Sequence, residues 1–438
     1  MKQSVKAVGL IGLFAVLAIA AAGCGGGGGN EGSSNGGGGG GNVEALPTSS
    51  CSSIYYEGDG DPEFIVASDL PLQGAGRAQT TEMVQAIKFA LKQRDFKAGD
   101  HKIGFQSCDD STAQAGAWDS AKCASNGRAY ASNKSVIGVV GTFNSGCAKI
   151  IVPILGRANP GPVAMVSPAN TSPGLTTDGP GAEAGEPDKY YPTGKRNYAR
   201  VVANDQIQGP ADAQFVKDQG LKKVFILNDK QTYGFGVATT FRGAAQKLGL
   251  TVAGFKGWDA KQSSYEALAN AIKATGADAI FLGGIICNNG AKLIKDLKQG
   301  VPDATLIAPD GFSDPKSNGA AFDDSYASVA GQPPSGLKGE GKSFVDDFGK
   351  QIGTTPNPYS QYGAQAMDVM LDAIAKSDGT RASVTTSLFG LKVTDGIIGT
   401  FTLNDKGDTS LGPITIYQQK AGKLNPLKTI VPEKNLTT

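Results

Sequence analysis

One stretch in the first half of the chain constrains the fold more than any other. An apolar, β-branched run, Val136–Gly141, is followed by a small polar loop, Thr142–Gly146, and then by a helical segment, Ala148–Arg157. A second short strand, Val163–Val166, ends in another small polar loop, Ser167–Thr171. The carboxyl ends of parallel strands meet at one edge of a sheet, which is where open α/β sheets bind ligands. The stretch therefore predicts either a ligand-binding edge or two ordinary strand-to-helix turns.

The same alternation of strand and helix runs through the rest of the chain. Met83, Ala86, Ile87 and Ala90, for example, follow the spacing of one helix face. The other predicted strands are 64–68, 102–106, 198–202, 223–227, 251–255, 279–282 and 305–308; the predicted helices are 80–94, 118–130, 209–219, 236–248, 265–275, 290–299 and 361–377; a long loop covers 176–198 and a β-rich segment 399–419. This order favours an α/β fold with two successive sheets and hence two lobes.

The N-terminus has the pattern of a secretory signal. Lys2 and Lys6 precede an apolar core, Val8–Ile19, and small residues then lead to Cys24. Small residues directly before a cysteine resemble the bacterial lipobox, in which the cysteine is acylated and becomes the new N-terminus. The alternative is a plain signal peptide that is cleaved after the alanines. The apolar core is shorter than the roughly 20 residues of a membrane-spanning helix, so we expect residues 1–24 to form a lipoprotein signal peptide that is cleaved directly before Cys24, which then carries a lipid anchor.

A low-complexity tract follows the predicted lipid site. Residues 25–42 are almost entirely Gly, Ser and Asn, with one Glu. Such a composition cannot bury enough apolar surface to fold and is typical of a flexible linker. We expect a tether that covers residues 25–60 and holds the folded part of the protein away from a membrane.

Composition and motifs argue against an enzyme or a nucleic-acid-binding protein. The 438 residues include 41 Lys and Arg against 40 Asp and Glu, and His101 is the only histidine. This charge balance does not favour nucleic acid, and one histidine removes most schemes of acid–base catalysis. Gly74-Ala75-Gly76 lacks the third glycine of a dinucleotide fingerprint because Gln79 occupies that place. We therefore predict no catalytic residue, no cofactor and no metal.

Taken together, the motifs resemble the branched-chain amino-acid-binding (Leu/Ile/Val-binding) family of type I periplasmic binding proteins, the substrate-binding components of ABC importers. The resemblance covers about 64–419 and rests on motifs that occur in a fixed order: a Gly-rich loop near Gly74, Asp109-Asp110, Val136-Ile137-Gly138 before Ser145, Val166-Ser167-Pro168 with Thr171, Asn228-Asp229-Lys230 with Tyr233-Gly234 and Gly236, Gly283-Gly284, Pro309-Asp310-Gly311, and Phe401 with Asp405-Lys406-Gly407-Asp408.

The resemblance implies two Rossmann-like lobes that are joined by three crossings and close on a ligand in the cleft between them. Residues 61–203 with 333–395 would form the N-terminal lobe, and residues 204–332 with 396–431 the C-terminal lobe. It further implies an extracytoplasmic protein, lipid-anchored at the cell surface or in the periplasm, that traps a small zwitterion such as a branched-chain amino acid or a relative. The partners would be ABC permease subunits, and the protein would be monomeric.

The family's binding residues can be carried over position by position. Ser145, beside Asn144, matches the serine that holds the ligand carboxylate, and Thr171 matches the threonine that touches both carboxylate and ammonium. Asn170 takes the place of a residue that offers its backbone carbonyl. Tyr233 matches a tyrosine of the second lobe, and Asp310 matches the acid, usually Glu, that pairs with the ammonium. Donors on one lobe and an acid on the other form a coherent site for a zwitterion.

Departures from the family pattern are expected to change the size and polarity of the pocket, so the sequence does not identify the solute. Ala78 stands where the family often has an aromatic residue, Ile285 stands where it has a tyrosine, and Asp310 is one methylene shorter than Glu. Gln73 adds a polar side chain in the first Gly-rich loop. A ligand-sensing receptor of the same fold, for an amide, a urea-like solute or an aromatic acid, therefore remains an alternative.

The cysteines indicate disulfides in an oxidising compartment. With Cys24 acylated, five remain: Cys51, Cys108, Cys123, Cys147 and Cys287. Cys108 ends a predicted strand and Cys123 lies in the following helix, which allows a local bridge. Cys147 lies beside the predicted binding loop and can compete as a partner.

Overall fold

The computed structural model describes residues 43–437, and its first lobe is built on a six-stranded sheet. The strand order is β2-β3-β1-β6-β7-β8, and all neighbours are parallel except β2 and β3. The strands are β1 (Phe64–Leu70), β2 (Lys97–Ala98), β3 (His101–Asp109), β6 (Val136–Gly141), β7 (Ala164–Ser167) and β8 (Tyr198–Arg200). A short hairpin, β4 (Ser111–Thr112) with β5 (Ala117–Trp118), follows β3.

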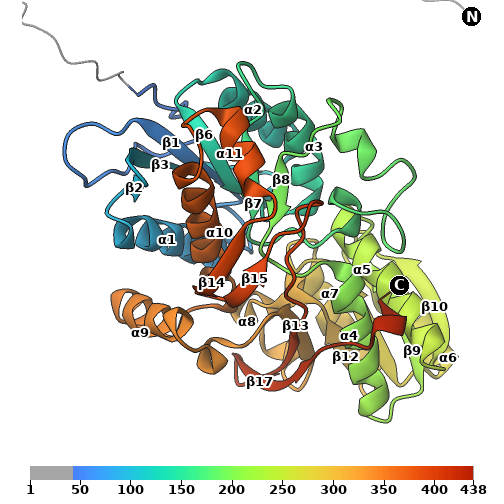
Figure 1. The fold of residues 1–438 in the computed structure, drawn as a ribbon. Helices are drawn as coiled ribbons and strands as arrows, with labels where there is room; N and C mark the ends of the chain where they lie inside the picture. Colours follow the sequence, from blue (N-terminus) through green and yellow to red (C-terminus); the bar gives the residue numbers. More distant parts are fainter. Residues whose placement is uncertain (1–42, 438) are drawn as a thin grey trace, which may run out of the picture. The chain divides into compact units, whose positions relative to one another are not determined.

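Helices cover both faces of this sheet (Figure 1). On one face α1 (Arg77–Gln93) packs side by side with α10 (Pro358–Ala375), and α11 (Arg381–Leu388) packs on β6 and β7. On the other face α2 (Ser120–Ser132) packs against α3 (Ser145–Gly156). Because both faces are covered, the central strands are buried and rich in apolar residues, as is usual for parallel sheets. Every residue of β6 is buried.

The second lobe repeats this plan with a seven-stranded sheet. Its order is β10-β9-β11-β12-β13-β16-β17, and the last two strands are antiparallel additions. The strands are β9 (Lys223–Asn228), β10 (Thr251–Gly257), β11 (Ala279–Gly283), β12 (Thr305–Ala308), β13 (Tyr326–Ala330), β16 (Ile414–Lys420) and β17 (Lys423–Ile430). Helices α4 (Asp205–Asp218) and α5 (Thr232–Lys247) cover one face, and α6 (Glu266–Thr275) and α7 (Gly290–Gly300) the other.

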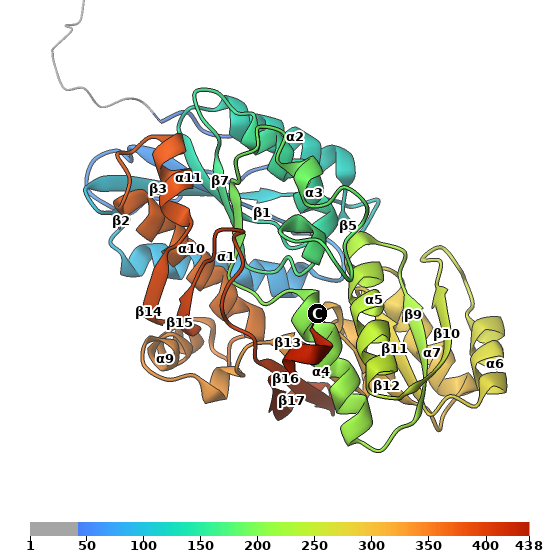
Figure 2. The same ribbon diagram turned by 45° about the vertical axis from the view of Figure 1, so that its right-hand side comes forward.

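The chain crosses between the lobes three times, and Figure 2 shows the crossing segments from a second side. The first crossing leads from β8 to α4, the second from β13 to α9 (Glu340–Ile352), and the third from the hairpin β14 (Lys392–Gly396) and β15 (Gly399–Thr402) to β16. The remaining helices are short: α8 (Pro315–Asn318) and the 3₁₀ turns η1 (Pro173–Leu175), η2 (Asp188–Tyr190), η3 (Asp310–Phe312), η4 (Ala320–Phe322), η5 (Pro334–Gly336) and η6 (Lys434–Leu436).

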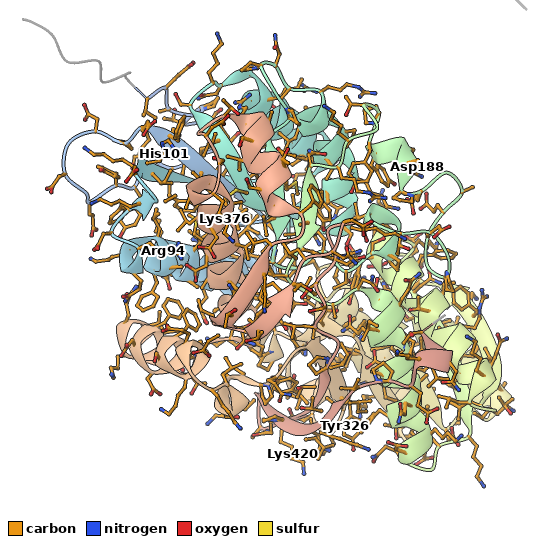
Figure 3. The ribbon with its side chains drawn as sticks, viewed as in Figure 1. Arg94, His101, Asp188, Tyr326, Lys376 and Lys420 are labelled. Atoms are coloured by element: carbon orange, nitrogen blue, oxygen red, sulfur yellow. A yellow bond between two sulfur atoms is a disulfide. The ribbon has the colours of Figure 1, made fainter. Side chains whose placement is uncertain are left out.

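Side chains fill the space between these layers (Figure 3). Arg94, labelled there at the end of α1, joins that helix to α10 by contacts with Asp372 at 2.7 Å and Asp368 at 3.6 Å. Burial raises the pKa of Asp368 to about 7, although the Arg94 charge opposes this. Within residues 43–437, no helix has the length and apolar character needed to cross a membrane.

The segment that precedes β1 is fixed to the first lobe, so the prediction that a flexible tether extends to residue 60 is wrong. Leu46 is 1% exposed, and its amide donates to Gln106 Oε1 at 2.7 Å. Cys51 forms a disulfide with Cys108 at the end of β3. The sequence signal was weak because this segment has no strand or helix pattern, and its contacts are with residues far along the chain. The predicted signal peptide, Cys24 and residues 25–42 of the tether lie outside the described residues.

The local bridge between Cys108 and Cys123 is also corrected. Cys108 pairs with Cys51, and Cys123 pairs with Cys147, which leaves Cys287 as a free thiol. The reason is packing: Cys51 lies in an antiparallel bridge opposite Cys108, whereas Cys123 lies on α2, which packs against α3 and Cys147.

Candidate functional site

The loops of the two lobes meet where each sheet reverses its strand order. Each sheet contains five parallel strands in the same relative order, β3-β1-β6-β7-β8 in the first lobe and β10-β9-β11-β12-β13 in the second. The direction in which successive strands are added reverses between β1 and β6 in the first lobe and between β9 and β11 in the second. Open α/β sheets bind ligands outside the carboxyl ends of strands at such a point. Loops 71–76 and 142–144 from the first lobe and loops 229–231 and 284–287 from the second line the same cleft.

Ser145 and Asn144 lie at the N-terminus of α3, on the first-lobe wall of this cleft. The helix begins three residues earlier than predicted, at Ser145 itself. The first amides of a helix have no partner within it and favour an anion. Ser145 Oγ accepts a hydrogen bond from the Ser172 amide at 3.3 Å, so its O–H remains able to donate. Asn144 caps the helix without a side-chain hydrogen bond. This end of the cleft is therefore suited to a carboxylate.

Asn170 and Thr171 lie in the next loop, and the structure gives them different roles. The side-chain amide of Asn170 donates through Nδ2 to the backbone carbonyls of Thr142 and Phe143 at 2.9 and 3.0 Å, which connects the two binding loops. Its backbone carbonyl, the predicted ligand contact, accepts from Arg200 at 3.0 Å. Thr171 is 1% exposed, and its hydroxyl has no hydrogen-bond partner among the described residues. Asn170 therefore supports the loop, and the buried Thr171 hydroxyl lies beside the Asp205 carboxylate.

Asp310, the predicted acid of the second lobe, accepts hydrogen bonds from two tyrosines. The Tyr233 hydroxyl donates to one carboxylate oxygen and the Tyr359 hydroxyl to the other. Burial raises the pKa of Asp310, and the two hydroxyls lower it. Tyr233 begins α5 in the second lobe, and Tyr359 comes from α10 on the first. The bond from Tyr359 to Asp310 therefore joins the lobes across the cleft.

The outer part of the cleft is mainly apolar. It is lined by Trp118, Phe143, Ile285 and the polar Gln73. Gln73 Nε2 donates to Asp109 Oδ2 at 2.7 Å, so its amide nitrogen is already used. Ala78 does not line the cleft: it is exposed on the first turn of α1 and lies in a separate surface groove, so no lost aromatic residue enlarges the pocket there.

The cleft is narrow in this conformation. The cavity beside Asp310 and Ser145 has a volume of about 20 Å³, roughly the space of one water molecule. Two further contacts hold the lobes together: Gln79 Nε2 donates to Ser313 Oγ at 3.0 Å, and Ser317 Oγ donates to the Ala75 carbonyl at 2.7 Å. A solute of amino-acid size must therefore enter after the lobes separate.

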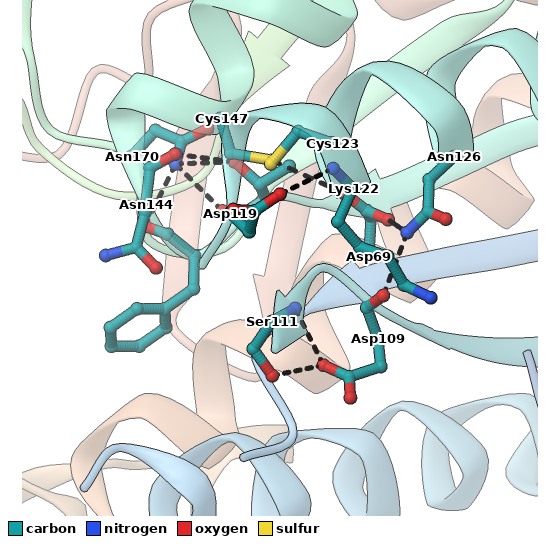
Figure 4. Close-up of a disulfide and its surroundings, with 12 residues drawn as sticks. Asp69, Asp109, Ser111, Asp119, Lys122, Cys123, Asn126, Asn144, Cys147 and Asn170 are labelled. Atoms are coloured by element: carbon teal, nitrogen blue, oxygen red, sulfur yellow. Dashed lines mark hydrogen bonds between the residues drawn. A yellow bond between two sulfur atoms is a disulfide. The ribbon is translucent and has the colours of Figure 1, made fainter. Parts of the chain in front are cut away.

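The disulfide between Cys123 and Cys147 lies next to the first binding loop, because Cys147 is on the first turn of α3 (Figure 4). Asp69 Oδ2 lies 3.6 Å from Cys147 Sγ, and Asn126 Nδ2 donates to Asp69 Oδ1 at 2.8 Å. Burial raises the pKa of Asp69 to about 7. Asp110, Cys123 and Cys147 are the described residues whose potential metal-ligand atoms gather within 4.8 Å. Because both sulfurs form the disulfide, this group is not a metal site.

The sequence did not reveal Tyr359, which contacts Asp310 in the site, or Asp205, a buried acid that contacts the loop of Thr171. Tyr359 lies 49 residues from Asp310 and more than a hundred from the other binding positions, at the start of a helix whose apolar spacing indicates only a core. Asp205 begins α4 directly after the first crossing and is fully buried. An acidic residue at the start of a helix usually caps it, so nothing in the sequence distinguishes Asp205 from an ordinary capping residue.

Comparison with known proteins identifies the family. The sequence profile of the periplasmic binding protein family matches residues 66–423, and the chain belongs to that family. A leucine-, isoleucine-, valine-, threonine- and alanine-binding protein of Pseudomonas aeruginosa is 24% identical over 258 residues, which are 58% of this chain and 65% of that protein. Leu/Ile/Val-binding protein homolog 2 of Brucella abortus is 22% identical over 85% of this chain and 95% of its own length.

Solved structures share the fold. A leucine-binding protein from Thermotoga maritima superposes with a TM-score of 0.73 at 21% identity and covers 84% of this chain and 99% of its own. A solute-binding protein of an ABC transporter from R. palustris, in complex with benzoate, gives a TM-score of 0.69 at 17% identity, covering 84% and 96%. The expected type I fold is thus confirmed, and the family is one of solute-binding proteins rather than enzymes.

Proposed function

We propose that this protein is the substrate-binding component of an ABC importer and captures a small zwitterion, an amino acid of the branched-chain type or a relative. The observation that carries the proposal is the division of charge across the cleft. Hydrogen-bond donors for a carboxylate, Ser145 and the α3 N-terminus, belong to the first lobe, and a buried acid, Asp310, belongs to the second. The names of the relatives in Pseudomonas and Brucella support the same ligand class.

Such a ligand stabilises the closed form because its two ends bind opposite lobes. A ligand shifts a conformational equilibrium only by its difference in affinity for the two states. A zwitterion that spans Ser145 and Asp310 meets both partners only when the lobes are close. In this proposal the lobes comprise residues 61–203 with 333–395 and residues 204–332 with 396–431.

The proposed location is the outer face of a bacterial membrane. Cys24 carries the lipid after removal of the residues that precede it, and a monomer held by this anchor delivers the solute to permease subunits. The Gly-rich composition of residues 25–42 supports a tether that is long enough for this delivery.

A thermal-shift screen of the protein against the standard amino acids, short amides, urea and benzoate tests the ligand class. Free ligand at one hundred times Kd stabilises the folded state by about 2.7 kcal/mol. We expect an amino acid to raise the melting temperature and Ser145→Ala and Asp310→Asn to abolish the shift. Ser132→Ala and Asp303→Asn, at exposed positions, serve as controls and should retain it.

An aromatic carboxylic acid is the second candidate, because Trp118 and Phe143 line the outer cleft and a structural neighbour binds benzoate. If only benzoate or an amide shifts the melt, the amino-acid assignment is refuted while the fold stands. A sensor role is separated from import by solute uptake in cells that lack the gene. Unchanged uptake, together with retained binding by the purified protein, would contradict the importer.

A further inference from the structure

A groove outside the ligand cleft lies between three helices and a hairpin of the first lobe. Its volume is about 410 Å³, and residues of α1, α9, α10 and the hairpin that begins with β14 line it. Figures 1 and 2 show these four elements side by side. Among the described residues, none that lines this groove also lines the ligand cleft. The groove is therefore separate from the site described above.

Acidic side chains outnumber basic ones along the groove. Arg94, labelled in Figure 3, is the one basic residue of its lining, and the acids are Glu340, Asp347, Asp368, Asp372 and Asp395. Arg94 Nη2 donates to Asp372 at 2.7 Å, and Lys350 from outside the groove lies 2.9 Å from Asp347. Arg94 Nη1 is 3.6 Å from Asp368, too far for a hydrogen bond. The Asp368 carboxylate, only 21% exposed, therefore accepts no hydrogen bond within residues 43–437.

Gln365 lies at the buried side of the groove and has an unused donor. Its side chain is 1% exposed and lines the groove. Its Oε1 accepts from the Ile398 amide at 3.2 Å, and its Nε2 has no hydrogen-bond partner among the described residues. Buried polar groups are normally hydrogen-bonded, so an amide nitrogen at this position requires an acceptor. A ligand for this groove therefore carries an acceptor as well as positive charge.

The remaining wall of the groove is apolar. It is formed by Phe89 of α1, Phe344 of α9, and Val393 and Ile397 of the hairpin. The rings of Phe89 and Phe344 meet edge to face with their centroids 5.8 Å apart. Lysine and arginine side chains pack their methylene stems on apolar surface and keep the charged head in a polar environment. Aromatic rings also attract such cations, so this wall suits a long basic side chain whose head reaches the acids.

We propose that this groove binds a basic peptide segment of a partner protein, with a lysine or arginine side chain beside Asp368 and a peptide carbonyl at Gln365. Such a segment supplies a charged donor for the carboxylates, a methylene stem for the apolar wall and an acceptor for the Gln365 amide. A protonated polyamine has the charge but only donors, so it leaves Gln365 unpaired. The inference goes beyond the proposed function and does not depend on the ligand of the cleft.

The test uses the full chain, purified in detergent, and calorimetric titration at low ionic strength. The probes are an acetylated and amidated tri-lysine peptide, spermidine, which has the same number of positive charges but no carbonyl, and the neutral tri-glutamine peptide. The main variant is Asp368→Asn. The pair Glu340→Gln with Asp395→Asn removes charge at exposed positions of the groove, and the matched control Asp346→Asn removes an exposed acid of α9 that does not line it.

We expect tri-lysine to bind the unaltered protein, spermidine to bind at least fivefold more weakly, and tri-glutamine not to bind. Asp368→Asn, and the pair of exposed substitutions, should each weaken tri-lysine binding at least fivefold, whereas Asp346→Asn stays within twofold. Gln365→Glu keeps an acceptor for the Ile398 amide and removes the donor, so the preference for tri-lysine over spermidine should fall below twofold.

Three results would overturn the inference: no measurable binding of tri-lysine, equal binding of spermidine or tri-glutamine, or an equal loss of binding in Asp346→Asn and Asp368→Asn. If Asp368→Asn does not give a cooperative thermal melt, the pair of exposed substitutions decides, because binding within twofold of the unaltered protein then overturns the inference. Each of these results leaves the proposed function intact, since that function is tested by amino acids in the cleft.

Discussion

Removing the disulfide between Cys51 and Cys108 should destabilise the first lobe by an amount that can be worked out. The two cysteines are 57 residues apart, and the loss of chain entropy from closing such a loop corresponds to about 4 kcal/mol at 25 °C. If residues 43–60 also detach, the exposure of Leu46, now 1% exposed, adds about 2 kcal/mol. The variant Cys51→Ala with Cys108→Ala should therefore lose about 4 to 6 kcal/mol.

Urea unfolding without reductant, followed by tryptophan fluorescence, measures this loss of stability. The two tryptophans of the chain, Trp118 and Trp258, lie in different lobes, so each reports on its own lobe. In a Trp258→Phe background, fluorescence follows the first lobe alone. The control Cys287→Ala removes the free thiol and should change the free energy of unfolding by less than about 1 kcal/mol, an ordinary effect for one substitution. A loss below about 1 kcal/mol in the double variant would refute the argument that the disulfide and the segment before β1 stabilise the lobe.

Three further outcomes are expected. Burial raises the pKa of Asp229 to about 6 from 3.8, so the folded state retains a proton that the unfolded state loses; stability falls by up to about 3 kcal/mol as pH rises from 4 through 6, and Asp229→Asn should flatten that part of the melting-temperature profile. Tyr233→Phe removes a donor that lowers the pKa of Asp310, so the pH below which the ligand is lost should move upward in titrations; a downward shift would contradict the assignment. Gly311→Ala places a Cβ 2.1 Å from the backbone of the facing loop and should abolish ligand binding, whereas Gly243→Ala on α5 meets no atom within 4 Å and should raise the melting temperature slightly.

The sequence was sufficient for the parts of the fold that are encoded locally. The alternation of apolar strands and amphipathic helices, and the small polar loops after β6 and β7, led to the type I fold and to the cleft edge where Asn144 and Ser145 lie. These features depend on periodicity within about twenty residues, which a single sequence displays directly.

The predictions that were wrong, and the contact that was not predicted, concern residues that are distant in the sequence or were placed by analogy. Cys108 pairs with a cysteine 57 positions away rather than with the nearer Cys123, because an antiparallel bridge brings the N-terminal segment beside β3. Tyr359 reaches Asp310 from the opposite lobe, and no spacing within either segment predicts that meeting. Ala78 was placed in the cleft by analogy, whereas the first turn of α1 directs it to solvent.

The repetition of one strand order in both lobes has a consequence for release of the solute. Each sheet contributes its own reversal point to the cleft. In the proposed site the first lobe binds the carboxylate of the ligand and the second lobe binds its ammonium group. In that proposal neither lobe alone offers partners to both ends of the zwitterion, so affinity is expected to be highest while the two lobes are close together. A permease that separates the lobes would then weaken binding at both ends of the solute at once, which we expect to be sufficient for its release.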